Sequence, residues 1–434
     1  MEYTNDDINA ALASDNPWSL VPTRDFDGHG TFIAGVACGS LIEEKHFSGV
    51  APLTTICVVK CKEAKNGLKA FYNIETEEPV YAETDILIAI EYLMKKAAEV
   101  NMPIILCFGM GTNLGGHISG NILGETLRTV GDRKGVAVVT ACGNEGNTSR
   151  HYSSDVLAPG EDVEVEIRSG SRHGFTLELY SDSPQILSVS ITSPSGEYSG
   201  KTIARHGEKR RVSFILEDTV VNIEYSLLSY ESGDEFVQMR FQNPSEGIWK
   251  VRVFNETRGN AYFNMWLPIR NFLPSTTYFL EADPNTTLCC PSNNVNLISV
   301  SYYDSLNRSI AVESSRGFTR NGSIKPDFAA PGINVYGPLP RFGDVYPSDE
   351  QEKDLTALYG YRSGSSMAAA ITAGAAALLM EWGILRGNDP NMDTVIIQKY
   401  LIRGADSDGV TEPNKLWGNG TLNVYDVFER LRGN

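Results

Sequence analysis

The chain contains 434 residues, and its 54 Asp and Glu residues outnumber its 37 Lys and Arg residues, which gives a formal net charge of −17. This acidic balance argues against nonspecific binding of nucleic acid and against docking on an anionic membrane, because both need clustered cations. The length predicts two or three domains. The longest run of small apolar residues, 368–380, is shorter than the roughly 20 residues that span a bilayer.

Two features of the sequence concern the compartment. The acidic start, MEYTNDDINAAL, lacks the apolar segment of a signal peptide. The seven cysteines include no Cys-x-x-Cys pair, which favours reduced thiols in a reducing compartment.

Helix and strand patterns alternate from residue 29 to about residue 150. Runs that are apolar throughout predict buried strands, and amphipathic or small-residue stretches predict the helices between them. Such strands indicate a parallel sheet that is covered by helices on both faces. In chain order we expect a helix at 30–38, a strand at 55–60, a helix at 84–100 capped by Thr84, a strand at 103–109, a helix at 118–133 and a strand at 135–141.

The pattern changes to alternation of apolar and polar residues between about 153 and 282. Short alternating runs separated by turns, such as 193–196, are typical of an antiparallel sandwich or jelly roll. We interpret this insertion as a rigid structural unit rather than a carbohydrate-binding module, because no cluster of aromatic residues or acidic loops stands out. Deleting it is expected to disturb stability more than the geometry of a site in the core.

The helix-and-strand pattern resumes after residue 283. Strands are expected at 295–301 and 333–336, a long helix at 366–382, and closing helices at 392–404 and 423–432. The sequence therefore predicts an α/β core, made of residues 1–152 and 283–434, that is interrupted by an all-β domain of residues 153–282.

Three polar residues stand where predicted elements begin or end. His29 opens a helix between two glycines, Asn144 follows an apolar strand, and Ser366 opens the long helix. Each has an ordinary structural interpretation when taken alone: a structural or metal-binding histidine, a turn asparagine and a helix N-cap serine. The functional interpretation combines them, because a serine at the positive end of a helix can act as a nucleophile beside its own backbone N–H.

Taken together and in this order, the motifs resemble those of the subtilisin-like serine proteases, or subtilases. A narrower resemblance is to the Csp germination proteases of clostridia, which carry a β jelly roll between the Asn and Ser motifs and process a spore-cortex hydrolase zymogen. The stretch 3–8 also looks like that group. The matching segments are His29-Gly-Thr31, Gly143-Asn-Glu-Gly146, Ala330-Pro-Gly332, Gly364-Ser-Ser-Met-Ala368, Thr372-Ala-Gly374 and Trp417-Gly-Asn-Gly-Thr-Leu422.

The resemblance implies a subtilisin-like fold and a serine endopeptidase acting through an acyl-enzyme. Ser366 would be the nucleophile and His29 the general base, and the Asn144 side chain would join the Ser366 N–H in an oxyanion hole. An extended substrate would lie against Cys107, Phe108 and Gly109. The sequence departs from the family at Cys107, where serine is usual, at Ser365, where threonine is usual, and at Ala370, where proline is usual.

The aspartate of the family's catalytic triad has no counterpart in this sequence. It normally ends a buried strand well upstream of the histidine, but no apolar strand precedes His29, and Asp25 and Asp27 are too close to it in sequence. We interpret this as a chain that begins downstream of that strand, and we expect either a gap between strands near His29 or the first 28 residues folded over it. The alternative is a catalytically impaired pseudoprotease that acts as a binding or sensing module.

The remaining expectations concern ligands and location. The expected partner is a protein or peptide substrate, without nucleic acid or membrane. We expect no cofactor, since no cluster of ligands supports a structural calcium ion, and a metal hydrolase using Asp27 and His29 is disfavoured for the same reason. The resemblance implies synthesis in a bacterial cytoplasm and association with the spore.

Overall fold

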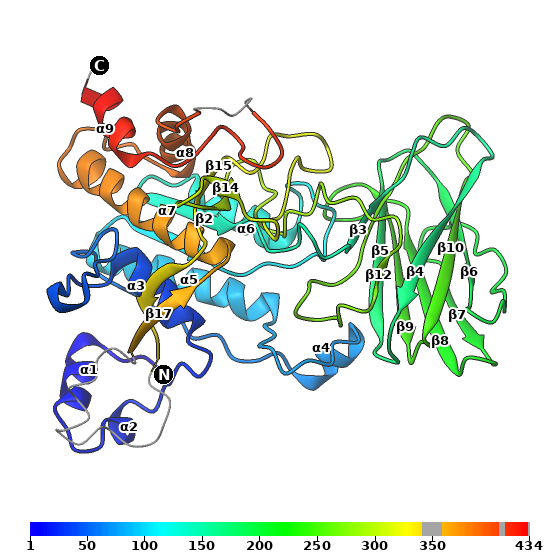
Figure 1. Ribbon diagram of the computed structural model, residues 1–434, viewed down its shortest axis with the longest axis horizontal. Helices are drawn as coiled ribbons and strands as arrows, with labels where there is room; N and C mark the ends of the chain where they lie inside the picture. The colour runs from blue at the N-terminus through cyan, green and yellow to red at the C-terminus, as the bar shows by residue number, and fades with distance from the viewer. Residues whose placement is uncertain (341–357, 408–412, 433–434) are drawn as a thin grey trace.

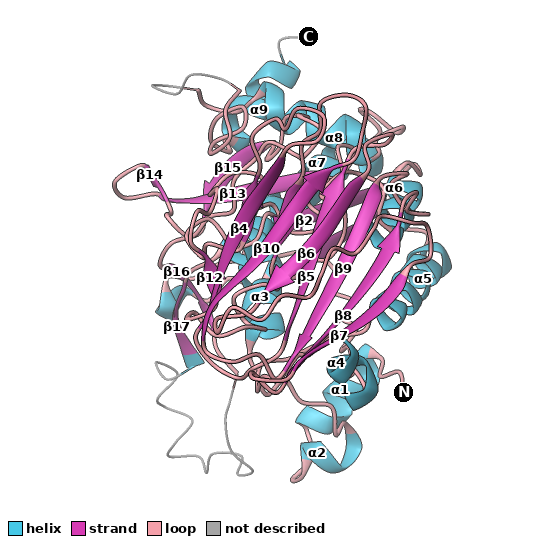
Figure 2. Cartoon of the chain, turned by 90° about the vertical axis from the view of Figure 1, so that its right-hand side faces the viewer, coloured by secondary structure: helices cyan, strands magenta, loops and turns pink. Residues whose placement is uncertain are grey.

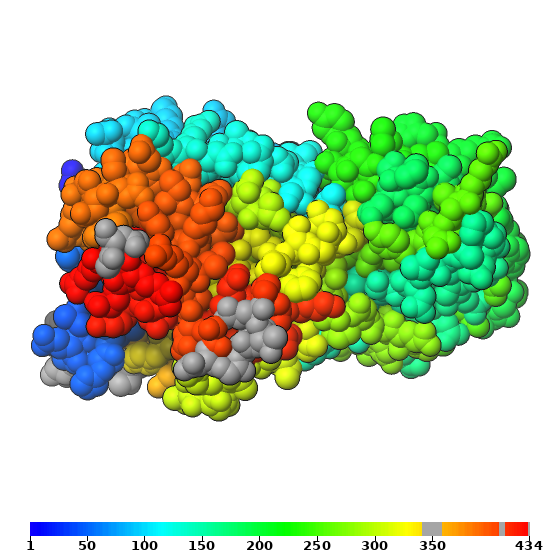
Figure 3. Space-filling model, turned by 90° about the horizontal axis from the view of Figure 1, so that it is seen from above, coloured from blue at the N-terminus to red at the C-terminus, as the bar shows by residue number. Residues whose placement is uncertain are grey.

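The computed structural model describes residues 1–340, 358–407 and 413–432. Figure 1 shows two bodies side by side, with the N-terminal and C-terminal thirds of the described chain in one body and the middle third in the other. The space-filling view from above shows the middle third as a lobe at one end of an elongated molecule (Figure 3).

A parallel sheet forms the centre of the first body, the core. Strands β1, β2, β13 and β15 run parallel, and the short β14 pairs antiparallel with the end of β13. All six residues of β2 are buried, as expected for a strand covered on both faces. The bounds are Ile104–Phe108 for β1, Val136–Ala141 for β2, Ile298–Asp304 for β13, Ser309–Ile310 for β14 and Phe328–Pro331 for β15.

Alternating side chains of β2 explain why two helical layers are needed. Val136 and Val138 pack with residues of α5 (Glu83–Val100) and α6 (Ile122–Gly131). Ala137 and Val139 point to the other face and pack with α7 (Ser365–Met380) and α8 (Thr394–Arg403). Because successive strand residues face opposite sides, an apolar run such as 136–141 is stable only between two apolar layers.

The central helix continues beyond α7 as a π-helical turn, Glu381–Leu385. The combined stretch of 21 residues is long and apolar enough to span a bilayer, but 61% of its most apolar 18-residue window is buried within the protein. This length exceeds the sequence estimate, which ended the apolar run at Met380. The extent of burial identifies the stretch as the core helix around which the sheet packs.

The second body is a sandwich of two antiparallel sheets (Figure 2), with strand orders β12-β4-β10-β6 and β3-β11-β5-β9-β8-β7. Its apolar core includes Phe241 and Trp249, whose rings meet edge to face. The strands are β3 His151–Ser153, β4 Asp162–Ser169, β5 Phe175–Ser181, β6 Leu187–Thr192, β7 Lys209–Phe214, β8 Thr219–Ser226, β9 Glu235–Gln242, β10 Gly247–Asn255, β11 Asn264–Trp266 and β12 Tyr278–Phe279.

The remaining described elements flank the core. The first 28 residues form α1 and α2, and Glu2 pairs with Lys96 of α5. The strands β16 and β17 form an antiparallel pair outside the central sheet. The bounds are α1 Asn5–Leu12, α2 Pro17–Leu20, α3 His29–Cys38, η1 Glu43–Lys45, α4 Asn66–Phe71, β16 Val335–Pro338, β17 Tyr359–Arg362 and α9 Val424–Arg432.

Several expected element boundaries need correction. The helix α5 begins at Glu83 with Ala82 at its N-cap, so Thr84 lies inside the first turn instead of capping it. The helix α6 begins only at Ile122, because the Asn121 side chain accepts a hydrogen bond from Gly124 N and fixes the start there. The strand expected at 333–336 is β16, which pairs with β17 and not with the parallel sheet.

The largest error concerns residues 55–60, which are not a buried strand. They form no strand in the structure, and Ile56 and Val58 are 50% and 69% exposed. The nearest strand in sequence, β1, pairs only with β2 among the described strands, so it lies at the edge of the sheet. The described sheet therefore ends at β1, with no strand on its far side, and residues 55–60 remain exposed because an apolar run becomes a buried strand only where a neighbour supplies hydrogen bonds and covers its side chains.

A pair of identical substitutions tests this correction. Val58→Ser is expected to change the free energy of unfolding by less than about 0.5 kcal/mol, as at other exposed positions. Val138→Ser, on the fully buried β2, is expected to cost about 3 kcal/mol, because it loses packed methyl groups and buries a hydroxyl. Urea unfolding of both variants gives the comparison, and equal losses would mean that residues 55–60 are covered in solution.

Candidate active site

Ser366 and His29 meet at Gly109, although they are far apart in sequence. Ser366 lies in the first turn of α7, and its Oγ donates a hydrogen bond of 2.8 Å to the Gly109 carbonyl. A methyl group added to Gly109 would lie 3.1 Å from His29 Cε1 and 3.2 Å from Ser366 Cβ. Both side chains therefore approach one point just beyond the carboxyl end of β1, where open α/β sheets bind ligands.

Glycines at unusual backbone angles position the two reacting side chains. Gly28 has a φ of 80° at the N-cap of α3, and Gly364 has a φ of 147° at the N-cap of α7. These conformations suit glycine. They allow α3 to begin at His29 and α7 to begin at Ser365, so Ser366 belongs to the first helical turn and is not the N-cap.

Asn144 approaches the same helix start from the end of β2. Its Oδ1 accepts a hydrogen bond of 3.0 Å from Ser365 N, and Gly143 N donates to Ser365 Oγ. Among the described residues, neither the Asn144 Nδ2 group nor the Ser366 N–H donates a hydrogen bond. Two donors thus stand ready beside Ser366, as an oxyanion hole requires.

Burial decides the charge of His29. Desolvation lowers the pKa of its imidazole, which Arg362 lowers further, and this outweighs the opposing effect of Asp27 and Asp25. The ring is therefore neutral near pH 7, the form that can accept a proton.

The two nearby carboxylates are engaged with backbone groups. Asp25 accepts hydrogen bonds from Gly28 N, Thr31 N and Thr31 Oγ1, and Asp27 accepts from His29 N. Burial raises the pKa of Asp25, but its hydrogen bonds outweigh burial and lower the pKa overall. Within the described part of the chain, no carboxylate accepts a hydrogen bond from the His29 ring. Asp25 and Asp27 therefore shape the start of α3 rather than orient the imidazole.

The expected substrate-binding residues behave differently from one another. Gly109 lies at the site, whereas Cys107 and Phe108 belong to β1 and point to its opposite faces. Phe108 is 9% exposed, and burial raises the pKa of the Cys107 thiol. The side chain of neither residue is presented to a peptide, so any contact from this stretch comes from backbone and from Gly109.

A segment that sequence reasoning missed adjoins Asn144. The loop 267–273 leaves the β sandwich after β11, and we call it the exit loop. Arg270 N donates to the Glu145 carboxylate at 3.1 Å, and Arg270 Nη1 donates to the Asn144 carbonyl at 3.3 Å. No sequence signal links residues 125 positions apart through loop contacts. Deleting the insertion would remove these contacts with the Asn144 segment, in addition to the expected effect on stability.

The described residues contain no group of three or more His, Cys, Asp or Glu side chains placed to hold a metal ion.

A single methyl group tests the convergence at Gly109. Gly109→Ala is expected to lower reactivity of Ser366 by about tenfold or more, because the methyl would crowd both His29 and Ser366, and displacements of about 1 Å cost up to about 10² in rate. Gly67→Ala, where an added methyl meets no atom within 4 Å, is the matched control. Equal reactivity of the two variants would contradict the placement.

Known proteins show the same architecture. A structure of the Clostridium perfringens CspB protease aligns with a TM-score of 0.85 and 28% identity, covering 100% of this chain and 87% of that one. The subtilisin-like protease SBT3.1 of Arabidopsis thaliana is 22% identical over 451 residues, and serine protease AprX of Bacillus subtilis is 29% identical over 144 residues. The chain spans about half the length of the first of these sequence relatives and about a third of the second.

The family model of the subtilase family, Peptidase S8, matches residues 2–199 and 258–420. This match includes the segments that carry His29, Asn144 and Ser366, and it covers most of the chain. The protein therefore belongs to the subtilase family of serine proteases, with a subtilisin-like fold.

Proposed function

We propose that the chain is a serine endopeptidase that hydrolyses peptide bonds through an acyl-enzyme. The observation that carries the proposal is the meeting of Ser366 and a neutral His29 at Gly109. His29 takes the proton of Ser366 Oγ as the oxygen attacks the peptide carbonyl, and it then gives that proton to the leaving amine. Water, deprotonated by the same imidazole, attacks the acyl-enzyme and releases the second product.

Two amide donors support the attack step. The negative charge that develops on the carbonyl oxygen would be received by Asn144 Nδ2 and Ser366 N–H. The N-terminus of α7 adds a favourable partial positive charge at the same place. In the resting arrangement Ser366 Oγ points to the Gly109 carbonyl, so a small rotation towards His29 precedes attack, as is common in unliganded sites.

The pH dependence follows from burial of His29. A general base works above its pKa, and the pKa of this imidazole lies below its usual value of 6.5. The acid limb of kcat/KM is therefore expected to have its midpoint below pH 6.5. A pH–rate profile with a chromogenic peptide measures it, and a midpoint above 7 would mean that a carboxylate stabilises the imidazolium.

For the substrate, we propose a spore-cortex hydrolase zymogen. The likeness to the CspB protease supports this choice, because it extends through the inserted sandwich as well as the core. Incubation of the purified zymogen with the chain, followed by N-terminal sequencing of the products, tests it. A single new N-terminus that Ser366→Ala fails to produce is expected, and an uncut zymogen beside a cleaved model peptide would contradict the substrate but not the chemistry.

One observation favours a second candidate function. The His29 ring has no carboxylate partner in the described residues, which suits a subtilase fold kept as a binding or sensing module. The test is covalent labelling by a fluorophosphonate, which reacts only with an activated serine. If Ser366 stays unlabelled while the zymogen still binds the chain, the binding module is the better account.

A further inference from the structure

The exit loop is fixed rigidly against the segment that carries Asn144. The buried Arg150 guanidinium donates to the carbonyls of Leu273, Pro274 and Thr277, and Leu267 N donates to the Arg150 carbonyl. The buried Glu145 carboxylate receives the Arg270 N–H. Arg150 thus holds both ends of the loop, one through its carbonyl and the other through its guanidinium, and the Glu145 carboxylate holds the middle.

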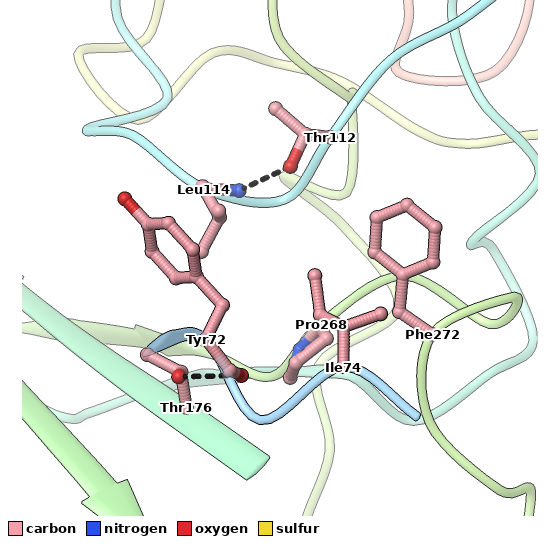
Figure 4. A pocket seen from close by; sticks show the side chains of 7 residues that line it. All are labelled: Tyr72, Ile74, Thr112, Leu114, Thr176, Pro268 and Phe272. Atoms are coloured by element: carbon pink, nitrogen blue, oxygen red, sulfur yellow. Dashed lines mark hydrogen bonds between the residues drawn. The ribbon is translucent and has the colours of Figure 1, made fainter. Parts of the chain in front are cut away.

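Apolar packing holds the other side of the exit loop. Figure 4 shows Pro268, Phe272 and Leu114 around a small cavity of about 10 Å³ that is also lined by Thr112 and Tyr72. This volume holds no more than about one water molecule, so we assign it no ligand. The segment 112–114 continues from Gly109, so the loop is packed against the chain that leads away from Ser366 and His29.

Arg270 lies between these two anchors, and its side chain is exposed. Its guanidinium makes a single hydrogen bond, to the Asn144 carbonyl, and forms no ion pair with any described residue. An arginine has five donors, so most of them remain free for a ligand. The neighbouring Glu145 carboxylate is buried and accepts hydrogen bonds from Arg270 N and Thr148 Oγ1, and it forms no ion pair with the guanidinium. Burial raises the pKa of this carboxyl, and the charge of the Arg270 guanidinium lowers it in part.

We propose that Arg270 is a specificity-determining residue that selects an acidic side chain in the substrate, within about two residues of the scissile bond. The inference rests on the proposed function. Asn144 would hold the scissile carbonyl, and two extended residues span about 7 Å, which matches a guanidinium bound to the backbone of Asn144 itself. The chain has a net charge of −17, and Arg270 is an exposed cation that forms no ion pair with a described residue, so it can attract an acidic peptide that the acidic surface would otherwise repel.

Direct binding tests this without catalysis. The probes are fluorescein-labelled octapeptide libraries in which one position is fixed as Glu or Gln and the others are degenerate. Their binding to the Ser366→Ala variant is measured by fluorescence anisotropy. At one position Glu is expected to bind about fivefold more tightly than Gln in low salt, the upper range for an exposed ion pair. The preference is expected to vanish near 1 M salt, where the screening length is about 3 Å.

Two substitutions separate this role from a structural one. Arg270→Gln should reduce the Glu-to-Gln ratio to about 1, and Arg270→Glu should favour Gln. Arg258→Gln, which removes an exposed cation from the turn after β10, should keep the fivefold ratio. An unchanged ratio in Arg270→Gln, or no Glu preference at any position, would overturn the inference.

The outcome is distinguishable from failure of the proposed chemistry. If a fluorophosphonate fails to label Ser366 but the Glu preference depends on Arg270, the specificity residue stands and the peptidase proposal falls. If Ser366 is labelled and no Glu preference is found, the peptidase proposal stands and the assignment of Arg270 as a specificity residue falls.

Discussion

The chain of residues 1–434 is expected to react with a fluorophosphonate about 10⁴-fold more slowly than the Clostridium perfringens CspB protease does. No carboxylate of the described residues bonds to the His29 ring, so these residues neither hold it in the useful tautomer nor stabilise it once it is protonated. In a serine protease of another fold, the comparable loss lowers turnover by about 10⁴. The measurement is the second-order rate constant of labelling for the two purified proteins under the same conditions.

The control for this prediction uses the two nearest acidic residues. Asp25→Asn and Asp27→Asn should leave the slow rate within a few-fold of the parent, because both carboxylates are bonded to backbone groups at the start of α3. A rate for the unmodified chain within tenfold of CspB, lost in either variant, would show that this aspartate completes the site after a local rearrangement.

Asn144→Ala is expected to lower the remaining reactivity towards a peptide ester by about 10²–10³, the cost of removing one such donor in subtilisin, a member of the same family. Oxyanion stabilisation does not depend on the partner of His29, so the loss should appear even in a slow enzyme. Asn147→Ala, an exposed position in the same segment, is the matched control and should react normally.

A second substitution separates catalysis from helix structure. Asn144 Oδ1 also accepts the Ser365 N–H, so alanine removes a contact at the start of α7 as well. Asn144→Asp keeps an acceptor there but replaces the donor with a carboxylate, whose negative charge would also repel an oxyanion. It should therefore be at least as slow as Asn144→Ala, with an unfolding midpoint closer to that of the parent. A fast Asn144→Asp enzyme would mean that the side chain supports the helix and does not bind the oxyanion.

The placement of His29, Asn144 and Ser366 could be predicted because each is specified locally. A strand that ends at residue 141 and helices that begin at His29 and Ser365 need only short glycine-containing segments, and these are visible in the sequence. The parallel sheet was predictable for a similar reason, since 136–141 is apolar except for Thr140 and needs cover on both faces.

The features that could not be predicted from the sequence depend on contacts between residues that are far apart in the chain. Residues 55–60 have the composition of a buried strand, but composition does not reveal whether a neighbouring strand is present, and Val58 is exposed. The contacts of Arg270 with Asn144 and Glu145 join loops from different bodies, and polar loop residues carry no periodic pattern. Both features are determined by tertiary contacts and not by the conformational preference of the local sequence.

The most direct test of the active-site assignment is to identify the residue that a fluorophosphonate modifies. The purified chain is labelled to completion, digested and analysed by mass spectrometry, alongside His29→Ala and Ser366→Ala. The account predicts a single modified peptide with the label on Ser366, much slower labelling in His29→Ala and none in Ser366→Ala. A label on another serine, such as Ser363 or Ser365, or an equal rate in His29→Ala, would contradict it.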